Sequence, residues 1–451
     1  MTLDEVALVT GGRLVNADPT VVVTGPVEYD SRAVSPGGLF VAFVGEQVDG
    51  HDYAADVLAA GAAGVLGTRD TGLPGVVVED PLVALARLAR VVVSRLPDLT
   101  VVGLTGSSGK TTTKDFIGQL LSRLGPTVAP AGSLNNELGY PYTVLKATPE
   151  TRFLVLEMGA RGVGHIRYLA QVAPPRIGVV LNIGTAHLGS FGSPEGIALA
   201  KGELVEAVPL AGVAILNADD PLVAGMADRT SARVVTFGEA DGADLRATDV
   251  RLDERGRAAY SLAGRAVRLA VIGRHQVSNS LAAAAVAHEA GLSLDDIAAA
   301  LGEIGIRSSR RMDVFERTDG VTVIDDSYNA NPSSMSAALR ALATLGQGRR
   351  TVAVLGYMAE LGDFEVAGHQ QVGRLAAELG VDRLIAIADA APVLDGAATV
   401  TGWTGAPVAV KDQAGAIAAL HLRPGDVVLV KGSRYRTWEV VDSLRPEEVR
   451  P

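Results

Sequence analysis

The sequence predicts an α/β protein of two or three domains, with a central parallel sheet of the P-loop type, a second doubly wound sheet towards the C-terminus and a smaller α/β region at the N-terminus. The first observation is length, because 451 residues exceed what one hydrophobic core organises. The second is the repeated alternation of short apolar runs with amphipathic segments, which is typical of parallel sheets. The third is a glycine-rich loop that separates a strand pattern from a helix pattern at 101–124.

Composition limits the classes of partner. Hydrophobic residues make up 48% of the chain, and 40 Lys and Arg stand against 51 Asp and Glu, for a net charge of −11. We therefore expect no nucleic-acid partner and no attraction to anionic membranes. The absence of cysteine excludes disulfides and thiolate metal ligands. The acidic N-terminus and the lack of a long apolar run predict a cytoplasmic protein with no membrane span.

The N-terminal domain is predicted for residues 1–97. Its apolar run 39–43 is flanked by Ser31, Arg32 and His51, which we expect to be exposed. Because guanidinium groups bind phosphate well, this segment is a candidate pocket for a polar, anionic ligand. Turn residues with a solvated arginine explain the same pattern equally well.

The central domain is predicted for residues 98–308, and its first strand and helix enclose the glycine-rich loop. The N-terminus of a helix favours an anion, and Gly106 and Gly109 allow its close approach. Lys110 is then placed to contact phosphates and the Thr111 hydroxyl to ligate Mg²⁺. An ordinary turn with a surface lysine is the alternative.

Two later strand patterns of this domain end in groups suited to a metal site. Glu157 follows the run 153–156, where P-loop enzymes often carry a metal-binding carboxylate. His187 follows the run 177–181. Ligands of parallel sheets gather beyond the carboxyl ends of the strands, so both side chains can share a site with Lys110.

The remaining segments suggest the rest of the organisation. Lys201 lies in a helix pattern that by itself predicts a solvated lysine, and the turn-rich stretch 244–269 predicts a small antiparallel addition. The basic segment 307–311 reads as a linker or as a cationic hinge. In the C-terminal domain, predicted for 309–451, Asp326 follows a strand, where acidic residues can hold ribose hydroxyls.

Together these segments resemble the Mur ligase family, the ATP-dependent amide ligases of peptidoglycan precursor synthesis. The resemblance covers nearly the whole chain and rests on residues 30–32, 38–40, 105–111, 135–137, 156–159, 200–203, 216–220, 273–275, 326–331 and 431–434. It implies a UDP-binding N-terminal domain, a central P-loop ATPase-like domain, and a Rossmann-like C-terminal domain that closes over the nucleotide.

The resemblance also implies a role for each matching residue. ATP would be bound by Gly106, Ser107, Ser108, Gly109, Lys110, Thr111, Thr112, Asn279, Arg311 and Asp326. Two Mg²⁺ ions would be held by Thr111, Glu157, His187 and Lys201, the last as a carbamylated lysine. Catalytic roles would fall to Lys110, Lys201, His187 and Arg311. Substrate would be contacted by Ser31, Arg32, Asn135, Asn136 and Asn331.

Within the family, the resemblance implies an enzyme that adds D-alanyl-D-alanine to UDP-N-acetylmuramoyl-tripeptide through an acyl phosphate. We expect it to be a monomer. The products would be the pentapeptide precursor, ADP and phosphate. The pentapeptide precursor would serve cell-wall biogenesis, and through it cell shape and cell division. Two departures concern acceptor binding: residues 161–165 stand where the family has an Asn-His pair, and Tyr357 stands where an acidic residue usually precedes Met358.

Three alternatives remain at this level. A sibling ligase would add one amino acid to an earlier UDP-muramoyl precursor. A non-catalytic scaffold would bind the nucleotide without phosphate release. A GTPase is disfavoured because the sequence has no Asn-Lys-x-Asp guanine motif.

Overall fold

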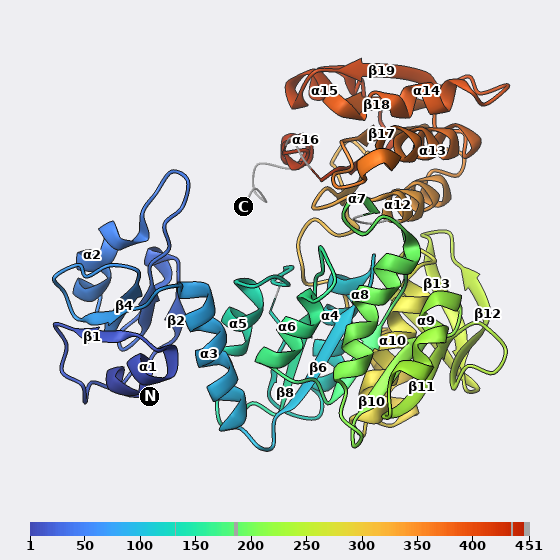
Figure 1. Cartoon of the computed structure of the whole chain (residues 1–451). Coiled ribbons are helices and arrows are strands. Elements are labelled where there is room, and N and C mark those ends of the chain that lie inside the picture. The colour runs from blue at the N-terminus through green and yellow to red at the C-terminus, as the bar shows by residue number, and fades with distance from the viewer. Residues whose placement is uncertain (131, 185–187, 434–435, 446–451) are drawn as a thin grey trace.

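Three β-sheets divide the chain into three successive parts (Figure 1). The computed structural model describes residues 1–130, 132–184, 188–433 and 436–445. The predicted α/β class with three sheets is confirmed, whereas the domain boundaries at 97/98 and 308/309 stay predictions. None of the helices in the described ranges is long and apolar enough to cross a membrane.

The first part is a five-stranded sheet in the order β1-β5-β4-β3-β2, in which β1 pairs antiparallel with β5 and the other pairs are parallel. Its strands are β1 (Arg13–Val15), β2 (Val27–Glu28), β3 (Leu39–Val41), β4 (Gly64–Gly67) and β5 (Gly75–Val77). Its helices are α1 (Leu3–Thr10), α2 (Ala54–Ala59) and α3 (Pro81–Ser94).

His51 in this part is buried, so the prediction that it is exposed is wrong. Its Nε2 accepts a hydrogen bond from the backbone N–H of Thr68 at 2.9 Å, and its Nδ1 lies 2.6 Å from a carboxylate oxygen of Asp49. Both ring nitrogens thus have protein partners, and the imidazole serves to fix loops rather than to face a ligand.

The middle part is a nine-stranded sheet in the order β14-β13-β12-β11-β10-β9-β6-β8-β7. The antiparallel addition predicted at 244–269 is confirmed as β12, β13 and β14. The strands are β6 (Thr100–Thr105), β7 (Thr127–Val128), β8 (Phe153–Glu157), β9 (Ile177–Val180), β10 (Val213–Asn217), β11 (Arg233–Gly238), β12 (Leu245–Leu252), β13 (Arg257–Leu262) and β14 (Arg265–Ile272). The helices are α4 (Lys110–Leu121), α5 (Gly139–Val144), α6 (His165–Val172), α7 (Leu188–Phe191), α8 (Pro194–Ala207), α9 (Pro221–Ala224), α10 (Gln276–Glu289) and α11 (Leu294–Leu301).

Helices cover both faces of this sheet, because successive strand residues point to opposite sides. Val102 and Leu104 pack with α4, α10 and α11, whereas Val101 packs on the other face with α5, α6 and α8. The near-continuous burial of β6 and β8 follows from this double cover.

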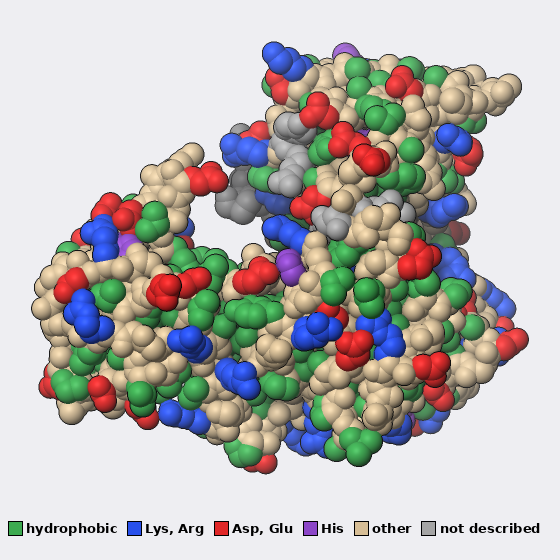
Figure 2. Space-filling view, viewed as in Figure 1, with side chains coloured by type: hydrophobic (Ala, Val, Ile, Leu, Met, Phe, Trp, Pro, Cys, Tyr) green, Lys and Arg blue, Asp and Glu red, His purple; other side chains and the backbone are tan. Residues whose placement is uncertain are grey.

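The third part is a six-stranded sheet in the order β15-β16-β20-β17-β18-β19, parallel except for the β15–β16 pair. Its strands are β15 (Asp313–Glu316), β16 (Thr322–Asp326), β17 (Thr351–Leu355), β18 (Arg383–Ile387), β19 (Ala406–Val410) and β20 (Val427–Lys431). Its helices are α12 (Pro332–Leu345), α13 (Glu365–Glu378), α14 (Pro392–Ala398), α15 (Gln413–Ala419) and α16 (Trp438–Leu444). Figure 2 shows the surface hollowed between the first and third parts, over the middle part.

Candidate active site

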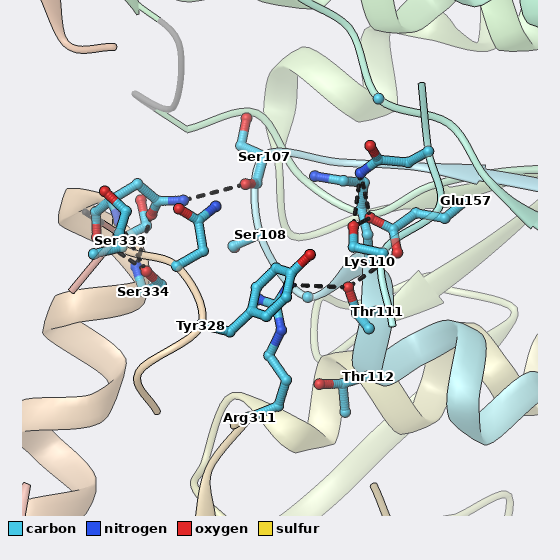
Figure 3. Close-up of a pocket in the computed structure, with 18 of the residues that line it drawn as sticks. Ser107, Ser108, Lys110, Thr111, Thr112, Glu157, Arg311, Tyr328, Ser333 and Ser334 are labelled. Carbon is cyan, nitrogen blue, oxygen red and sulfur yellow. Dashed lines mark hydrogen bonds between the residues drawn. The ribbon is translucent and has the colours of Figure 1, made fainter. Parts of the chain in front are cut away.

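A pocket of about 610 Å³ lies where the middle and third parts meet. The middle part contributes the loop 107–112 and the strand-end residues Glu157 and Asn182. The third part contributes Asp326, residues 328–331, Ser333 and Ser334, and Arg311 comes from the segment between the two parts. The loop, strand-end and hinge residues that the sequence singled out therefore face one cavity (Figure 3).

The predicted phosphate loop joins β6 to α4 in the expected strand–loop–helix order. Gly109 has a φ of +80°, and a Cβ at this position would lie 2.4 Å from Oδ1 of Asn279. Both the conformation and the space therefore require glycine. Oδ1 of Asn182 accepts hydrogen bonds from the backbone N–H groups of Ser107 and Ser108 at 3.0 and 2.9 Å.

Asn182 was not singled out from the sequence, although it stands two residues beyond the end of β9 in a parallel sheet. That position, at the carboxyl end of a central strand, was the available signal. Its amide oxygen holds the loop from the side, so the backbone of Ser107 and Ser108 is fixed before any ligand binds.

Lys110 is partly buried, and its Nζ donates a hydrogen bond to the carbonyl oxygen of Gly106 at 2.8 Å. Burial lowers the pKa of Lys110, while the nearby carboxylate of Glu157 acts in the opposite direction. The ammonium group thus lies over its own loop, within the cavity where the sequence predicts phosphates.

Glu157 ends β8 and is almost fully buried. One carboxylate oxygen accepts a hydrogen bond from the Thr111 hydroxyl at 2.9 Å. The other accepts from the hydroxyl of Ser133 at 2.7 Å and from Nδ2 of Asn135 at 2.8 Å. Asn135, predicted to contact substrate, therefore braces this carboxylate, and Ser133 does so without having been predicted.

Asn136 lines the same cavity, but its Oδ1 accepts the backbone N–H of Gly139 at 2.8 Å and so secures the start of α5. Ser31 and Arg32 are not brought to the cavity at all. The Arg32 side chain is 87% exposed and pairs with Asp30 in its own turn. Their predicted role would have to be played at a separate region of the first part.

Lys201 is 3% exposed and lines the cavity, so the solvated lysine that the helix pattern alone suggested is wrong. Ile197 and Leu204 stand four residues before and three residues after it, which places all three on the buried face of α8. Burial lowers its pKa well below the ordinary lysine value, and the positive charge of Lys110 lowers it further. His187, its predicted companion, lies outside the described residues.

Within the described ranges, no hydrogen bond or ion pair reaches Nζ of Lys201, and no three His, Cys, Asp or Glu side chains converge as a metal cluster. The carboxylate of Glu157 and the hydroxyl of Thr111 are oxygen donors that line the same cavity as Lys201.

The third part closes the opposite wall of the cavity. Nη2 of Arg311 lies 3.3 Å from Oγ1 of Thr111, and its guanidinium group lies 4.2 Å from the ring centre of Tyr328 (Figure 3). Asn331 caps α12 and donates from Nδ2 to the carbonyl oxygen of Ser107 at 3.3 Å. Tyr328 was part of the sequence motif but had no predicted role.

Asp326 lines the cavity but is held by protein groups. One oxygen lies 2.5 Å from Nζ of Lys431, and the other accepts the backbone N–H of Met312 at 3.1 Å. Burial lowers the pKa of Lys431, and burial lowers the pKa of His275 beside it to about 4, so this imidazole is neutral at pH 7.

Of the two departures from the family pattern, Arg161 and His165 line the cavity, whereas Tyr357 does not line it. His165 Nδ1 is 3.6 Å from a carboxylate oxygen of Glu137, and Arg161 Nε is 4.0 Å from one of Glu360. Tyr357 donates its hydroxyl hydrogen bond to Glu365.

Comparison with known proteins accounts for this combination of a phosphate loop, a buried carboxylate and a second Rossmann-like sheet. Family models match residues 26–100 (Mur ligase family, catalytic domain), 104–287 (Mur ligase middle domain) and 310–434 (Mur ligase, glutamate ligase domain). Together these models cover most of the chain, with one model for each sheet.

Curated relatives match along nearly their full length. The UDP-N-acetylmuramoyl-tripeptide–D-alanyl-D-alanine ligase of Mycobacterium tuberculosis is 48% identical over 96% of this chain and 95% of that protein. The protein of the same name in Escherichia coli is 36% identical over 98% and 97%.

Solved structures agree. MurF from Acinetobacter baumannii has a TM-score of 0.86 at 34% identity and covers 98% of each chain. MurF ligase from Thermotoga maritima in complex with ADP has a TM-score of 0.77 at 30% identity, over 93% of this chain and 97% of that one. On this evidence the chain is an ATP-dependent ligase that belongs to the Mur ligase family.

Proposed function

We propose that this enzyme joins D-alanyl-D-alanine to UDP-N-acetylmuramoyl-tripeptide with hydrolysis of ATP to ADP and phosphate. The observation that carries the proposal is the full-length similarity to relatives of that name, at 48% and 36% identity. The cavity supports it, because a phosphate loop, an arginine and a buried carboxylate face one space. The predicted cytoplasmic location and monomeric state stay predictions.

Amide formation from a carboxylate requires a leaving group, which ATP supplies. An oxygen of the peptide's terminal carboxylate attacks the γ-phosphorus, the bond to the β–γ bridging oxygen breaks, and ADP leaves. The amine of D-alanyl-D-alanine then attacks the acyl carbon, loses a proton, and expels phosphate from the tetrahedral intermediate. The first step brings two anions together, so positive groups aligned on the γ-phosphate are required.

The chain supplies these groups from both sides of the cavity. Lys110 and the N–H groups of the loop lie on the floor, and Arg311 faces them from the hinge. Arg311 is already within 3.3 Å of Thr111 and stacked over Tyr328, so its guanidinium group is held before ATP binds. Such preorganised charge is worth more in a dry cavity than in water.

The donor set fits Mg²⁺, which prefers oxygen ligands. Glu157 and Thr111 would hold it together with Lys201 in its carbamylated form, and the ion would neutralise charge on the phosphates. Lys201 is almost fully buried yet lines the cavity, and burial lowers its pKa, so its amine is compatible with conversion to an anionic carbamate. His187, the fourth predicted ligand, lies outside the described residues.

An acceptor screen tests the proposal. Purified enzyme with Mg·ATP and UDP-N-acetylmuramoyl-tripeptide should release phosphate when D-alanyl-D-alanine is added, and mass spectrometry should show the pentapeptide product. Release driven by a single amino acid on a shorter precursor would instead identify a sibling ligase. Nucleotide binding without release on any pair would identify a scaffold, and preference for GTP would exclude the ATP-dependent reaction.

A further inference from the structure

One face of the phosphate-loop helix α4 holds the segment that leads into the third part. Asp115, Gln119 and Arg123 follow each other at intervals of four residues, so they lie along one face of the helix. Asp115 and Gln119 are within α4, and Arg123 stands two residues beyond its end at Leu121. We call these three residues and their partners in 303–308 the α4 seam.

The α4 seam consists mainly of side chain to backbone contacts. One carboxylate oxygen of Asp115 accepts the N–H groups of Arg307 and Ser308 at 3.0 and 2.8 Å. Gln119 donates to the carbonyl oxygen of Gly305 at 2.6 Å and accepts its N–H at 3.3 Å.

At the far end of the seam, Arg123 lies 2.6 Å from Glu303. Because the partners run 307–308, 305, 303 as the helix advances, the segment lies antiparallel along α4.

The inner end of the seam is buried. The Ser308 hydroxyl donates to the second oxygen of Asp115 at 3.1 Å and accepts the N–H of Gly132 at 2.9 Å. Lys114 lies 3.2 Å from the same carboxylate oxygen and donates to the carbonyl oxygens of Pro130 and Gly132. Since the side chains of Lys114 and Asp115 are each 2% exposed, water cannot replace these contacts.

The chain is anchored up to Ser308 and changes conformation immediately after it. Arg310 and Met312 have φ values of +60° and +50°, which is a conformation that non-glycine residues rarely adopt. Arg311 lies between them, three residues beyond the last seam contact. Its position relative to Thr111 is therefore set by a short, conformationally restricted segment that begins at a fixed point on α4.

We propose that Asp115 is a positioning residue: by fixing Ser308 to the phosphate-loop helix, it holds Arg311 in register with Thr111 and the transferred phosphate. This inference rests on the proposed function, in which Arg311 meets the γ-phosphate. The same helix carries Lys110 and Thr111 at its start, so α4 sets the floor of the cavity and, through the seam, the arginine opposite it. A displacement of reacting groups by about 1 Å typically costs about 100-fold in rate.

A double-mutant cycle tests the coupling, with phosphate release measured on the acceptor pair that the screen identifies. We expect Arg311→Ala to lower kcat by about 100-fold or more, and Asp115→Ala to lower it by about 10- to 100-fold. In the Arg311→Ala background, Asp115→Ala should cost less than about 3-fold, because the group that it positions is gone. The Kd of ATP, measured by equilibrium binding, should change little in Asp115→Ala, since the phosphate loop is intact.

Arg123→Ala is the matched control, because it removes the outermost contact of the same face, where Glu303 is 69% exposed. Its kcat should remain within about 2-fold of the wild type. If Asp115→Ala does not fold, Gln119→Ala enters the same cycle with the same expectation. Additive losses of kcat in the double variant, or a folded Asp115→Ala enzyme with unchanged kcat, would overturn the inference.

The cycle separates this inference from the proposed function. A wild-type enzyme that fails with every UDP-muramoyl substrate, or an Arg311→Ala variant with normal turnover, refutes the proposed chemistry. A large effect of Arg311→Ala combined with additivity refutes the role of Asp115 alone.

Discussion

The Thr111 hydroxyl joins two parts of the molecule: it donates to Glu157 on β8 at 2.9 Å and lies 3.3 Å from Nη2 of Arg311. One oxygen atom of the phosphate loop thus meets both the carboxylate predicted to hold a metal and the arginine predicted to meet the transferred phosphate. Single substitutions around this hydroxyl can therefore test the predicted phosphate contacts and the predicted metal contacts separately.

Substitution of Lys110 by alanine should abolish phosphate release without unfolding the protein. In the described residues the hydrogen-bond partner of its Nζ is the carbonyl oxygen of Gly106, so little packing is lost. Loss of one charge contact in the transition state typically costs at least about 100-fold in kcat. Steady-state kinetics measure the loss of phosphate release, and thermal unfolding shows whether the variant is folded. Near-normal turnover in a folded variant would exclude the phosphate-loop assignment.

Replacement of Glu157 by glutamine should raise the Mg²⁺ concentration needed for half-maximal activity. The amide keeps nearly the same shape but replaces one acceptor oxygen with a donor, which faces donors already present on Thr111, Ser133 and Asn135. A Mg²⁺ titration of phosphate release, with direct Mn²⁺ binding as a second readout, measures the shift. Identical titrations for both enzymes would show that Glu157 does not ligate the metal.

Substitution of Lys201 by alanine should nearly abolish ligation, and added short carboxylic acids should partly restore it. The side chain is buried beside the cavity, so its removal leaves space in which an acetate-sized anion can supply the lost oxygen donors. The test measures the rate of ligation by the variant with carboxylic acids of increasing size. Chloride at equal ionic strength is the control. A variant that ligates normally, or a folded native enzyme that shows no carbamate carbon signal by NMR in ¹³C-bicarbonate, contradicts the role.

ATP analogue and UDP-precursor together should make the enzyme more compact, because closure excludes water from a reactive acyl phosphate. Contacts from Arg311 to Thr111 and from Asn331 to Ser107 already join the third part to the phosphate loop, so we expect most of the movement in the first part. Small-angle scattering measures the radius of gyration. An unchanged radius with both ligands bound would contradict closure.

His275 should make the free energy of unfolding depend on pH between about 4 and 6.5. Burial lowers its pKa below the ordinary value; Asp326 opposes this shift and Lys431 adds to it. The unfolded chain therefore binds more protons in this window, and stability falls as the pH drops through it, by up to about 3 kcal/mol. In denaturant unfolding at several pH values, the free energy of unfolding should depend less steeply on pH for His275→Gln than for the wild type. Equal slopes for the two proteins would refute the assignment.

The sequence predicted the backbone of the site well, because strand ends and glycine-rich loops are local features. Lys110, Thr111 and Glu157 lie together because parallel strands end at one edge of the sheet, as expected. Gly109 was singled out for its lack of a side chain, and its φ of +80° explains why.

The remaining features depend on packing between distant segments. The helix pattern alone predicts a solvated Lys201, because a lysine is usually exposed. The pattern does not show that a cavity lies against the buried face of α8, where this side chain is placed. His51 was expected to be exposed, yet its ring nitrogens find Asp49 and Thr68. Asp115 and Asn182 carried no motif of their own, since their partners are backbone groups 193 and 74 residues away. Side chain to backbone contacts of this kind leave almost no trace in a single sequence.

The cavity has walls on two bodies, and this has a consequence for inhibition. A compound that wedges between Tyr328 and Thr111 would keep the arginine away from the nucleotide. Because Thr111 and Arg311 are both predicted to contact ATP, such a molecule would compete with the nucleotide at this end of the phosphate loop. Such a molecule would inhibit by holding the middle and third parts at the wrong spacing. Because it contacts both parts, its binding would stabilise them together rather than either one alone.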